Sequence, residues 1–232
     1  MLIAVTRPPS AAIARCLLTY MQRDPIDVDR AIEQHRAYRA AIAKAGATVV
    51  ALPPDPDCPD SVFVEDNAVV VPELAVIASM ASESRRREVA FVSRFLENHR
   101  PIATIDPPAT LEGGDVFIVG RTLFVGLSTR TNQAGADRLA QLLAPHGYTI
   151  HTVPTPGCLH LTTGSSWIGG KTILANPEWV DASAFTGFEV LPIHPEEPFA
   201  ANSLRIGDAL IYPTQFPRTA DRLREHGLNL IT

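Results

Sequence analysis

Residues 111–125 read Leu-Glu-Gly-Gly-Asp-Val-Phe-Ile-Val-Gly-Arg-Thr-Leu-Phe-Val. Two apolar stretches, Asp115–Val119 and Thr122–Val125, flank the dipeptide Gly120-Arg121. A glycine-containing two-residue connection between apolar stretches is a strong β-hairpin signal. The hydrophobic periodicity after it predicts a helix over 132–146 and then a strand over 148–153. The predicted unit is therefore hairpin, helix, strand.

The same order of elements is predicted four times along the chain. The four predicted units span 62–105, 115–153, 159–193 and 203–231. Their spacing is in the range of ring or propeller arrays, in which each repeat is one supersecondary unit.

The N-terminal part predicts only half of a fifth unit. It has a strand over Leu2–Thr6, an amphipathic helix over Val28–Ala45 and a strand over Ala47–Leu52. Closing a ring requires a partner strand for Leu2–Thr6, most simply from residues after Thr232, so we expect the chain to be cut short. The alternative is an open sheet without such a partner. We predict one domain over 1–232.

Composition and charge exclude several classes of function. The 232 residues are 46% hydrophobic and 19% charged with a net charge of -5, so nothing indicates binding to nucleic acid or to an anionic membrane. No apolar run is long enough to span a bilayer. The cysteines, Cys16, Cys58 and Cys158, form no CxxC pair, which predicts a reduced, cytoplasmic protein.

Acidic residues interrupt apolar runs at two places. Glu65 and Asp66 lie within Val62–Val71, and Glu112 precedes Gly113-Gly114. Ionised acids among Val and Phe are costly unless a cation meets them. Together with His160, which has leucine on both sides, they predict a pocket for a cationic substrate with acid–base chemistry.

Six segments resemble dimethylarginine dimethylaminohydrolases, guanidine-modifying enzymes of the amidinotransferase (pentein) superfamily. The segments are Asp60–Asp66, Ser84–Arg86, Leu111–Asp115, Ser128–Asn132, Leu159–Leu161 and Ala200–Asn202. The resemblance covers essentially the whole chain, in order and with similar spacing.

The resemblance implies a fold and an activity. The fold is α/β, a five-fold pseudosymmetric propeller (pentein) of ββαβ units with the site on its axis, here with the last closing strand missing. The activity converts methylated arginine to citrulline and an alkylamine without a metal or organic cofactor. The expected ligand is a small guanidino amino acid, and the expected assembly is a monomer or homodimer.

Three acids match positions that bind the guanidinium in this family. Asp60 and Asp66 match the residues that grip it, and Glu65 matches a supporting neighbour. Carboxylates suit this task because they pair with the planar N–H fork of a guanidinium. On a strand Glu65 and Asp66 would face opposite sides, so we assign the contact to Asp66. Strand-end turn acids are the alternative.

The resemblance gives His160 and Glu112 the acid–base roles. His160 protonates the departing amine and then activates water, while Glu112 orients His160 and contacts the guanidinium. A nearby carboxylate raises the imidazole pKa toward the working range. Gly113-Gly114 suits close backbone approach or a bulge, and we interpret Asp115 as structural.

Two arginines and two apolar residues complete the predicted site. Arg85 and Arg130 match residues that clamp the substrate carboxylate, to which arginine binds in bidentate fashion. A solvated helix start is the alternative for Arg85. Phe63 is assigned to the pocket wall, with core packing as the alternative. Leu18 lies in 16–25, which is either a mobile loop over the pocket mouth or a short packed helix.

One family residue has no counterpart here. The family nucleophile is a cysteine in a strand close to the C-terminus, beyond Thr232, and Cys16, Cys58 and Cys158 do not occupy its position. Three interpretations follow: a hydrolase whose last strand is missing, an inactive relative that binds arginine-like ligands, or another guanidine enzyme, arginine deiminase-like or amidinotransferase-like. A metal hydrolase is a weak fourth, because no paired-histidine spacing is present.

Overall fold

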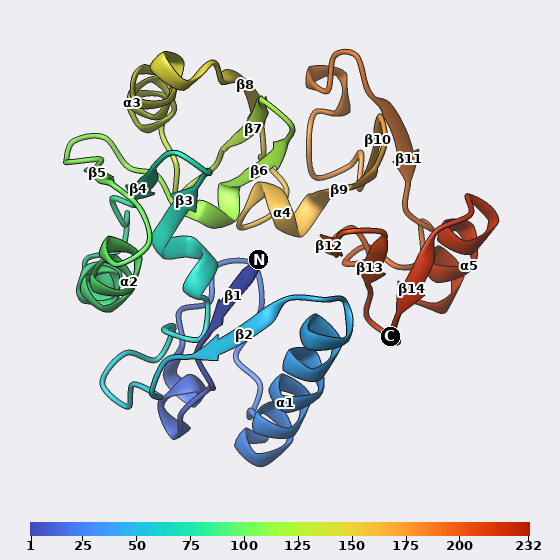
Figure 1. The fold of residues 1–232 in the computed structure, drawn as a ribbon. Helices are drawn as coiled ribbons and strands as arrows, with labels where there is room; N and C mark the ends of the chain where they lie inside the picture. The colour runs from blue at the N-terminus through green and yellow to red at the C-terminus, as the bar shows by residue number, and fades with distance from the viewer. The chain divides into compact units, whose positions relative to one another are not determined.

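The computed structural model describes residues 1–232. The backbone divides into two compact units, one formed by Met1–Val64 with Ser203–Thr232 and the other by Glu65–Asn202. Both units combine small sheets with helices, so the predicted α/β class is confirmed (Figure 1). The five-fold propeller and the single domain stay predictions.

The unit Glu65–Asn202 contains three sheets of identical construction. In each, two antiparallel strands form a hairpin and a third strand pairs in parallel with the second. The predicted hairpin and following strand are confirmed in all three, but the predicted helix between them is present only in the first two; the third has a 3-10 turn there. The sheets are β3 (Ala68–Val70), β4 (Ala75–Ile77) and β5 (Ile102–Thr104); β6 (Val116–Val119), β7 (Thr122–Leu127) and β8 (Thr149–Pro154); and β9 (Ser165–Gly169), β10 (Thr172–Ala175) and β11 (Glu189–Pro192).

Two longer helices of this unit precede the third strand of their sheets. They are α2 (Val89–Glu97) and α3 (Gln133–Leu143). The side chain of Asn132 caps α3 by accepting a hydrogen bond from the amide of Gly135 at 2.8 Å. The short helical turns are η2 (Val64–Asn67), η3 (Glu83–Glu88), η4 (Gly113–Asp115), η5 (Ala144–His146), α4 (Leu161–Gly164) and η6 (Ala182–Ala184).

Two of the predicted strands are wrong at the ends that carry candidate site residues. The strand expected from Val62 begins only at Ala68, after the 3-10 turn η2. The strand expected from Leu159 begins only at Ser165, after the single helical turn α4. Short apolar runs do not by themselves distinguish a strand from a buried turn. Glu65, Asp66 and His160 therefore lie on turns, not on strands.

The other unit contains two sheets and two longer helices. Its elements are β1 (Ile3–Thr6), η1 (Ala11–Arg15), α1 (Val28–Lys44), β2 (Thr48–Ala51), β12 (Leu204–Ile206), β13 (Ala209–Ile211), α5 (Pro217–Glu225) and β14 (Asn229–Ile231). β1 and β2 pair in parallel, and β12–β13–β14 repeat the hairpin-plus-parallel-strand pattern. A small core joins α1 to this sheet through buried Ile42, Ile206 and Ile211. Gly46, at a φ of 102°, follows the C-terminal cap residue of α1, where glycine is favoured.

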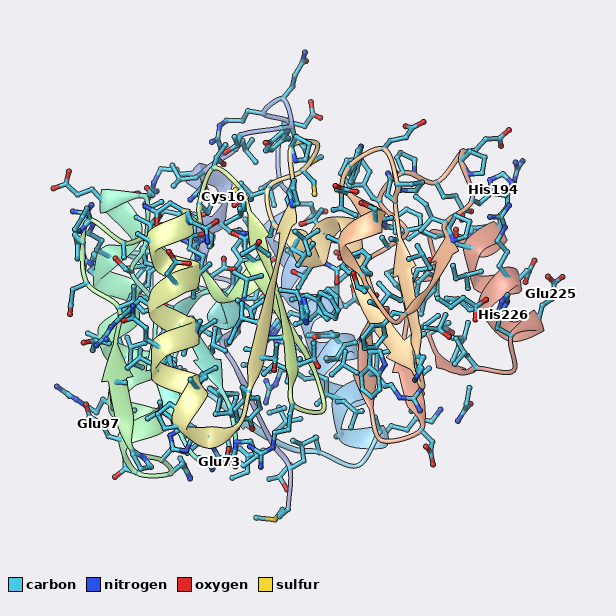
Figure 2. The ribbon with its side chains drawn as sticks, turned by 90° about the horizontal axis from the view of Figure 1, so that it is seen from above. Cys16, Glu73, Glu97, His194, Glu225 and His226 are labelled. Carbon is cyan, nitrogen blue, oxygen red and sulfur yellow. The ribbon has the colours of Figure 1, made fainter.

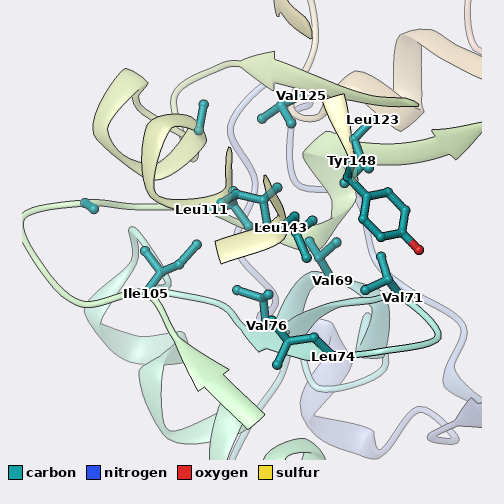
Figure 3. Close-up of a cluster of buried hydrophobic side chains, with 13 residues drawn as sticks. Val69, Val71, Leu74, Val76, Ile105, Leu111, Leu123, Val125, Leu143 and Tyr148 are labelled. Atoms are coloured by element: carbon teal, nitrogen blue, oxygen red, sulfur yellow. The ribbon is translucent and has the colours of Figure 1, made fainter. Parts of the chain in front are cut away.

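A large apolar cluster holds the first two sheets of the unit Glu65–Asn202 together. Val69 and Val76 come from one sheet, Leu123 and Val125 from the next, and Leu111 lies between them (Figure 3). All five are at most 4% exposed. Burial of a Val or Leu side chain stabilises the fold by about 1.5–3 kcal/mol, so this cluster fixes the loop before η4 against β3.

A polar contact joins the same two sheets at their periphery. Glu73, labelled in Figure 2, accepts a hydrogen bond from the hydroxyl of Tyr148 at 2.9 Å and pairs with Arg121 at 2.7 Å. The guanidinium of Arg121 also lies over the Tyr148 ring, 4.5 Å from its centre.

No helix of the protein combines the length and hydrophobicity needed to cross a bilayer.

Candidate active site

The turn η2 places Asp66 at the start of β3. Asp66 is 3% exposed, and its Oδ1 accepts a hydrogen bond from the amide of Gly114 at 3.2 Å. This contact spans 48 residues of sequence. The acidic segment and the Leu111–Asp115 segment are therefore neighbours in the fold, as the predicted common site requires.

The double glycine allows this approach. A Cβ added to Gly113 would overlap the backbone oxygen of Glu65, and one added to Gly114 would overlap the Asp66 carboxylate and press on the His160 ring. No other residue fits at either position without displacing a neighbour. The prediction that Gly113-Gly114 serves close backbone approach is confirmed.

His160 stands at the N-cap position of α4 and points its two ring nitrogens at different acids. Nε2 lies 3.5 Å from Oδ1 of Asp66 and 3.6 Å from Oε2 of Glu112. Nδ1 lies 3.4 Å from Oδ2 of Asp115. The side chain is 9% exposed, so all three carboxylates act on it across little water.

Arg85 is an internal counter-ion to these acids. Its guanidinium is bound side-on by Glu88, with Nη2 3.0 Å and Nε 3.2 Å from Oε2. Nη1 then donates to Asp66 at 2.8 Å and lies 3.4 Å from Glu112. Arg85 is 3% exposed, which is incompatible with the alternative of a solvated helix start.

Arg130 approaches Glu112 from the other side. Its Nη1 lies 3.5 Å from Oε1 of Glu112, and the same oxygen accepts a hydrogen bond from the amide of Ala81 at 3.3 Å. Glu112 has no exposed surface. Two arginines and a histidine therefore surround one buried carboxylate, which compensates much of the cost of its burial.

The neighbouring charges shift the pKa of His160 upward. Loss of hydration lowers the pKa of the imidazole, but Asp115, Asp66 and Glu112 raise it by more, so the result lies above the ordinary 6.5. Burial raises the pKa of Glu112, and the charge of Asp66 adds to the rise. A histidine whose pKa is raised gives up its proton less readily to water, which suits a general acid.

Glu65 has a raised pKa of a different kind. Loss of hydration of its carboxyl and the charge of Asp66 raise the pKa of Glu65 to about 7. The residue nevertheless keeps accessible surface, so water or a ligand can reach it. Ionisable groups shifted toward neutrality are typical of functional sites.

Three further predicted site residues belong to the other unit. Asp60 is 5% exposed, and both of its carboxylate oxygens accept from the amide of Leu17, at 3.0 Å and 3.3 Å. Leu18 is 39% exposed and Phe63 41% exposed. The core-packing alternative for Phe63 is therefore wrong. Segment 16–25 contains no helix, since η1 ends at Arg15, so the packed-helix alternative for this loop is wrong as well.

Cys16 and Cys158 lack the environment of a nucleophile. All three cysteines are buried and free. Burial, then the charge of Asp115, raises the pKa of Cys158 to about 12, and its thiol donates to the carbonyl of His160 at 3.2 Å. Burial also raises the pKa of Cys16. Reactive thiols have lowered pKa values, so neither of these two has thiolate character.

The donor set resembles a cation site but is already neutralised. Ligand atoms of Asp66, Glu112 and His160 all lie within 4.8 Å of one another. The Nη1 of Arg85 contacts both acids of this set, so a metal ion would meet a resident positive charge. A planar guanidinium fits these carboxylates better.

Two buried acids of the site were not predicted as site residues: Asp115 was interpreted as structural, and Glu88 was not singled out. Asp115 contacts His160, and Glu88 holds Arg85. Glu88 follows three arginines in a stretch that suggested a solvated face, so no sequence signal pointed to it. Asp115 directly precedes an apolar strand, the same signal that singled out Glu112.

Comparison with known proteins identifies the family. Residues 25–182 match the family model described as arginine deiminase. A dimethylarginine dimethylaminohydrolase of Pseudomonas aeruginosa is 33% identical over 229 residues, which cover 98% of this chain and 90% of that protein. The chain belongs to the dimethylarginine dimethylaminohydrolase family.

Other members of the dimethylarginine dimethylaminohydrolase family agree with this assignment. The Streptomyces coelicolor protein of that name is 36% identical over 97% of this chain and 86% of its own length. The solved structure of the Pseudomonas aeruginosa enzyme, a cysteine-to-serine mutant complexed with citrulline, matches with a TM-score of 0.94 at 32% identity, covering 99% of this chain and 91% of that one.

A more distant structure shares the fold alone. The N-terminal domain of ArgZ, an arginine dihydrolase from cyanobacteria, matches with a TM-score of 0.89 at 19% identity, covering 99% of this chain and 89% of that one. The resemblance found in the sequence is confirmed, and the dimethylarginine dimethylaminohydrolase family is one of amidine hydrolases.

Proposed function

We propose that this protein hydrolyses the guanidinium of an N-methylated arginine, releasing an alkylamine and citrulline by covalent cysteine catalysis. One observation carries the proposal: His160 presents Nε2 3.5 Å from Asp66 and 3.6 Å from Glu112. His160, a proton donor when protonated, thus lies beside two carboxylates that can bind a planar guanidinium. The relatives named for this reaction support the choice of substrate class.

The residues have distinct proposed roles. Asp66 and Asp60 bind the guanidinium N–H groups, Glu65 supports them, and Glu112 contacts the guanidinium while holding His160 protonated. Carboxylates that match the N–H fork keep the cation flat and expose its central carbon to attack. Leu18 and Phe63 cover the alkyl part of the ligand.

In the first proposed step a thiolate attacks the guanidinium carbon. Protonated His160 delivers its proton to the departing alkylamine, so a C–S bond forms and a C–N bond breaks. In the second step neutral His160 takes a proton from water, whose oxygen attacks the same carbon. The adduct loses its remaining water-derived proton to solvent as the C–S bond breaks, so the thiolate returns and the neutral urea group of citrulline remains.

The proposed thiolate is not Cys16, Cys58 or Cys158. The family resemblance assigns it to a cysteine of a C-terminal strand that the 232 residues do not include. A second candidate function, binding of arginine-like ligands without turnover, is favoured by the burial of all three cysteines. Both functions use the same carboxylates, so the test measures binding and turnover separately.

Arg130 is the proposed clamp for the substrate carboxylate. The same role for Arg85 requires its Nη1 to leave Asp66 and Glu112, whereas its side-on pair with Glu88 can remain. Substrate would then replace one guanidinium on Asp66 with another, at no net change in the charge around that acid.

Calorimetry with dimethylarginine, arginine and citrulline tests the binding part. The protein should bind at least one of them, and Asp66→Asn should weaken binding by about tenfold or more, the effect of losing a charged hydrogen bond. Asp106→Asn, an exposed acid of the same unit, is the matched control and should bind normally. A folded protein that binds none of the three would overturn the proposal.

Turnover then separates the hydrolase from the binding protein. We expect negligible citrulline formation by the 232-residue chain and robust formation by a form carrying the C-terminal cysteine. Robust turnover by the 232-residue chain would overturn the assignment of the nucleophile, and Cys158→Ser would identify the alternative. Binding with no turnover by either form would favour the second candidate.

A further inference from the structure

Asp115 is a fully buried acid to which the proposed reaction gives no task. It follows the double glycine, ends the turn η4 and has no exposed surface. Burying a carboxylate is costly unless its environment compensates the charge. Its contacts therefore indicate what its position serves.

Three neutral donors compensate the charge of Asp115. Oδ2 accepts hydrogen bonds from the hydroxyls of Ser128 and Thr131, both at 2.7 Å. Oδ1 accepts from the amide of Leu161 at 2.9 Å. Oδ2 thus already accepts two hydrogen bonds, and the Nδ1 of His160 approaches the same oxygen as a third group, at 3.4 Å.

The same carboxylate binds the backbone next to the histidine and lies beside its ring. The amide of Leu161 belongs to the residue directly after His160, so Oδ1 fixes the start of α4. A second hydrogen bond, from the hydroxyl of Thr162 to the carbonyl of Gly114 at 2.7 Å, ties this helical turn to η4. In Figure 1 α4 lies beside the turn that leads into β6. His160 therefore has little freedom to move relative to Asp115.

The two ring nitrogens of His160 face different kinds of acid. On the Nδ1 side the charge of Asp115 is compensated by three neutral donors, two hydroxyls and one backbone amide. On the Nε2 side Asp66 and Glu112 are paired with Arg85, and Glu112 also with Arg130. An acid fixed by neutral donors orients a histidine, whereas acids already paired with guanidinium groups suit a ligand of that kind.

We propose that Asp115 is the positioning residue of the site: it accepts the Nδ1 proton of His160 and thereby directs Nε2 toward Asp66, Glu112 and the reacting guanidinium. The inference rests on the proposed function, and it transfers the orienting role from Glu112 to Asp115. Glu112 is then free to act on the substrate. The tautomer of a histidine is set by the hydrogen bond that its other nitrogen makes.

The charged groups that act on His160 are Asp66, Glu112, Asp115 and, at longer range, Glu65. The test therefore compares variants of more than one acid. Asp115→Asn keeps the shape and removes the charge on the Nδ1 side. Glu112→Gln does the same on the Nε2 side and is the matched control.

NMR of protein labelled with 15N in histidine reads the tautomer of His160 without any turnover. His160→Gln assigns the signals. In the wild-type protein the neutral ring should carry its proton on Nδ1. Asp115→Asn should lower the pKa of His160 and populate the other tautomer, while Glu112→Gln should lower the pKa and keep the proton on Nδ1.

Two results would overturn the inference. One is a neutral wild-type ring protonated on Nε2, a measurement that needs no variant and stands if Asp115→Asn does not fold. The other is an Asp115→Asn protein with the wild-type tautomer and titration. Because both are read without substrate, they are distinguishable from failure of the proposed function.

Kinetics give a second readout in a form that produces citrulline. Loss of the acid that orients a catalytic histidine lowers kcat by up to about 10⁴-fold in the serine protease case. Asp115→Asn should lower kcat by about 10²-fold or more and change KM by less than about threefold. A change in KM alone would contradict a positioning role.

Discussion

The Nη1 of Arg85 lies 2.8 Å from Oδ2 of Asp66, one of the acids that we propose for binding the substrate guanidinium. The site thus holds a guanidinium of its own against its principal acid. The other edge of the Arg85 guanidinium is bound side-on by Glu88. Glu88 is buried and fixes the arginine in place. The acids are compensated before any ligand arrives, and this explains how several carboxylates share one interior.

Arg85→Ala should destabilise the protein strongly. The substitution leaves Asp66, Glu88 and Glu112 buried without their common cation, and breaking a buried ion pair in this way costs about 3–5 kcal/mol. Urea denaturation measures the loss. Arg87→Ala, an exposed arginine of the same turn, should change stability by less than about 0.5 kcal/mol. Equal effects of the two variants would contradict the counter-ion role of Arg85.

Gly114→Ala should damage the site more than the fold. The added Cβ overlaps the Asp66 carboxylate and presses on the His160 ring, so both side chains must move. We expect about tenfold or greater loss of ligand affinity by calorimetry. Gly120→Ala is the control: its φ of 60° makes alanine strained, but nothing lies within 4 Å of the new atom. It should lower stability by about 1 kcal/mol and leave affinity unchanged.

Stability should fall as pH rises above 6.5, in a way that depends on His160. The folded-state pKa of His160 is raised above its ordinary 6.5. Its contribution to stability is therefore fully present below that value and is lost as pH rises through the folded-state pKa. Urea denaturation at several pH values should show a steeper decline for the wild-type protein than for His160→Gln. Parallel curves would mean that the neighbouring acids do not hold the imidazole proton.

His160→Ala and Glu112→Gln should separate catalysis from binding. In a form that produces citrulline, His160→Ala should lower kcat by about 10²–10⁴-fold, the usual contribution of general acid–base catalysis. Glu112→Gln should lower kcat strongly and weaken ligand binding as well, because it touches the guanidinium. Citrulline assays and calorimetry on the same preparations give both quantities. Normal turnover by His160→Ala would remove His160 from the mechanism.

Local sequence patterns were sufficient for the repeat. The glycine turn at Gly120-Arg121 joins β6 and β7 as predicted, and the helix predicted from Val28 is α1 within one residue of its end. These features depend on turn geometry and on hydrophobic period, both of which are encoded within about twenty residues. The acids and the histidine were also recognisable, because polar groups stand out in apolar stretches.

Only the tertiary structure decided how those polar groups are paired. Asp66 meets Gly114, and Asp115 meets Leu161, across 48 and 46 residues of sequence. The turns at η2 and α4 that carry Asp66 and His160 look like strand ends in the sequence, because apolar periodicity reports burial and not backbone direction. Which carboxylate compensates which cation depends on separations of 3–4 Å. The attraction between opposite charges weakens with distance and strengthens where water is excluded. The sequence by itself determined that this protein buries acids beside a histidine; the packing of η2, η4 and α4 decided that Arg85 neutralises Asp66 and that Asp115 faces Nδ1 of His160.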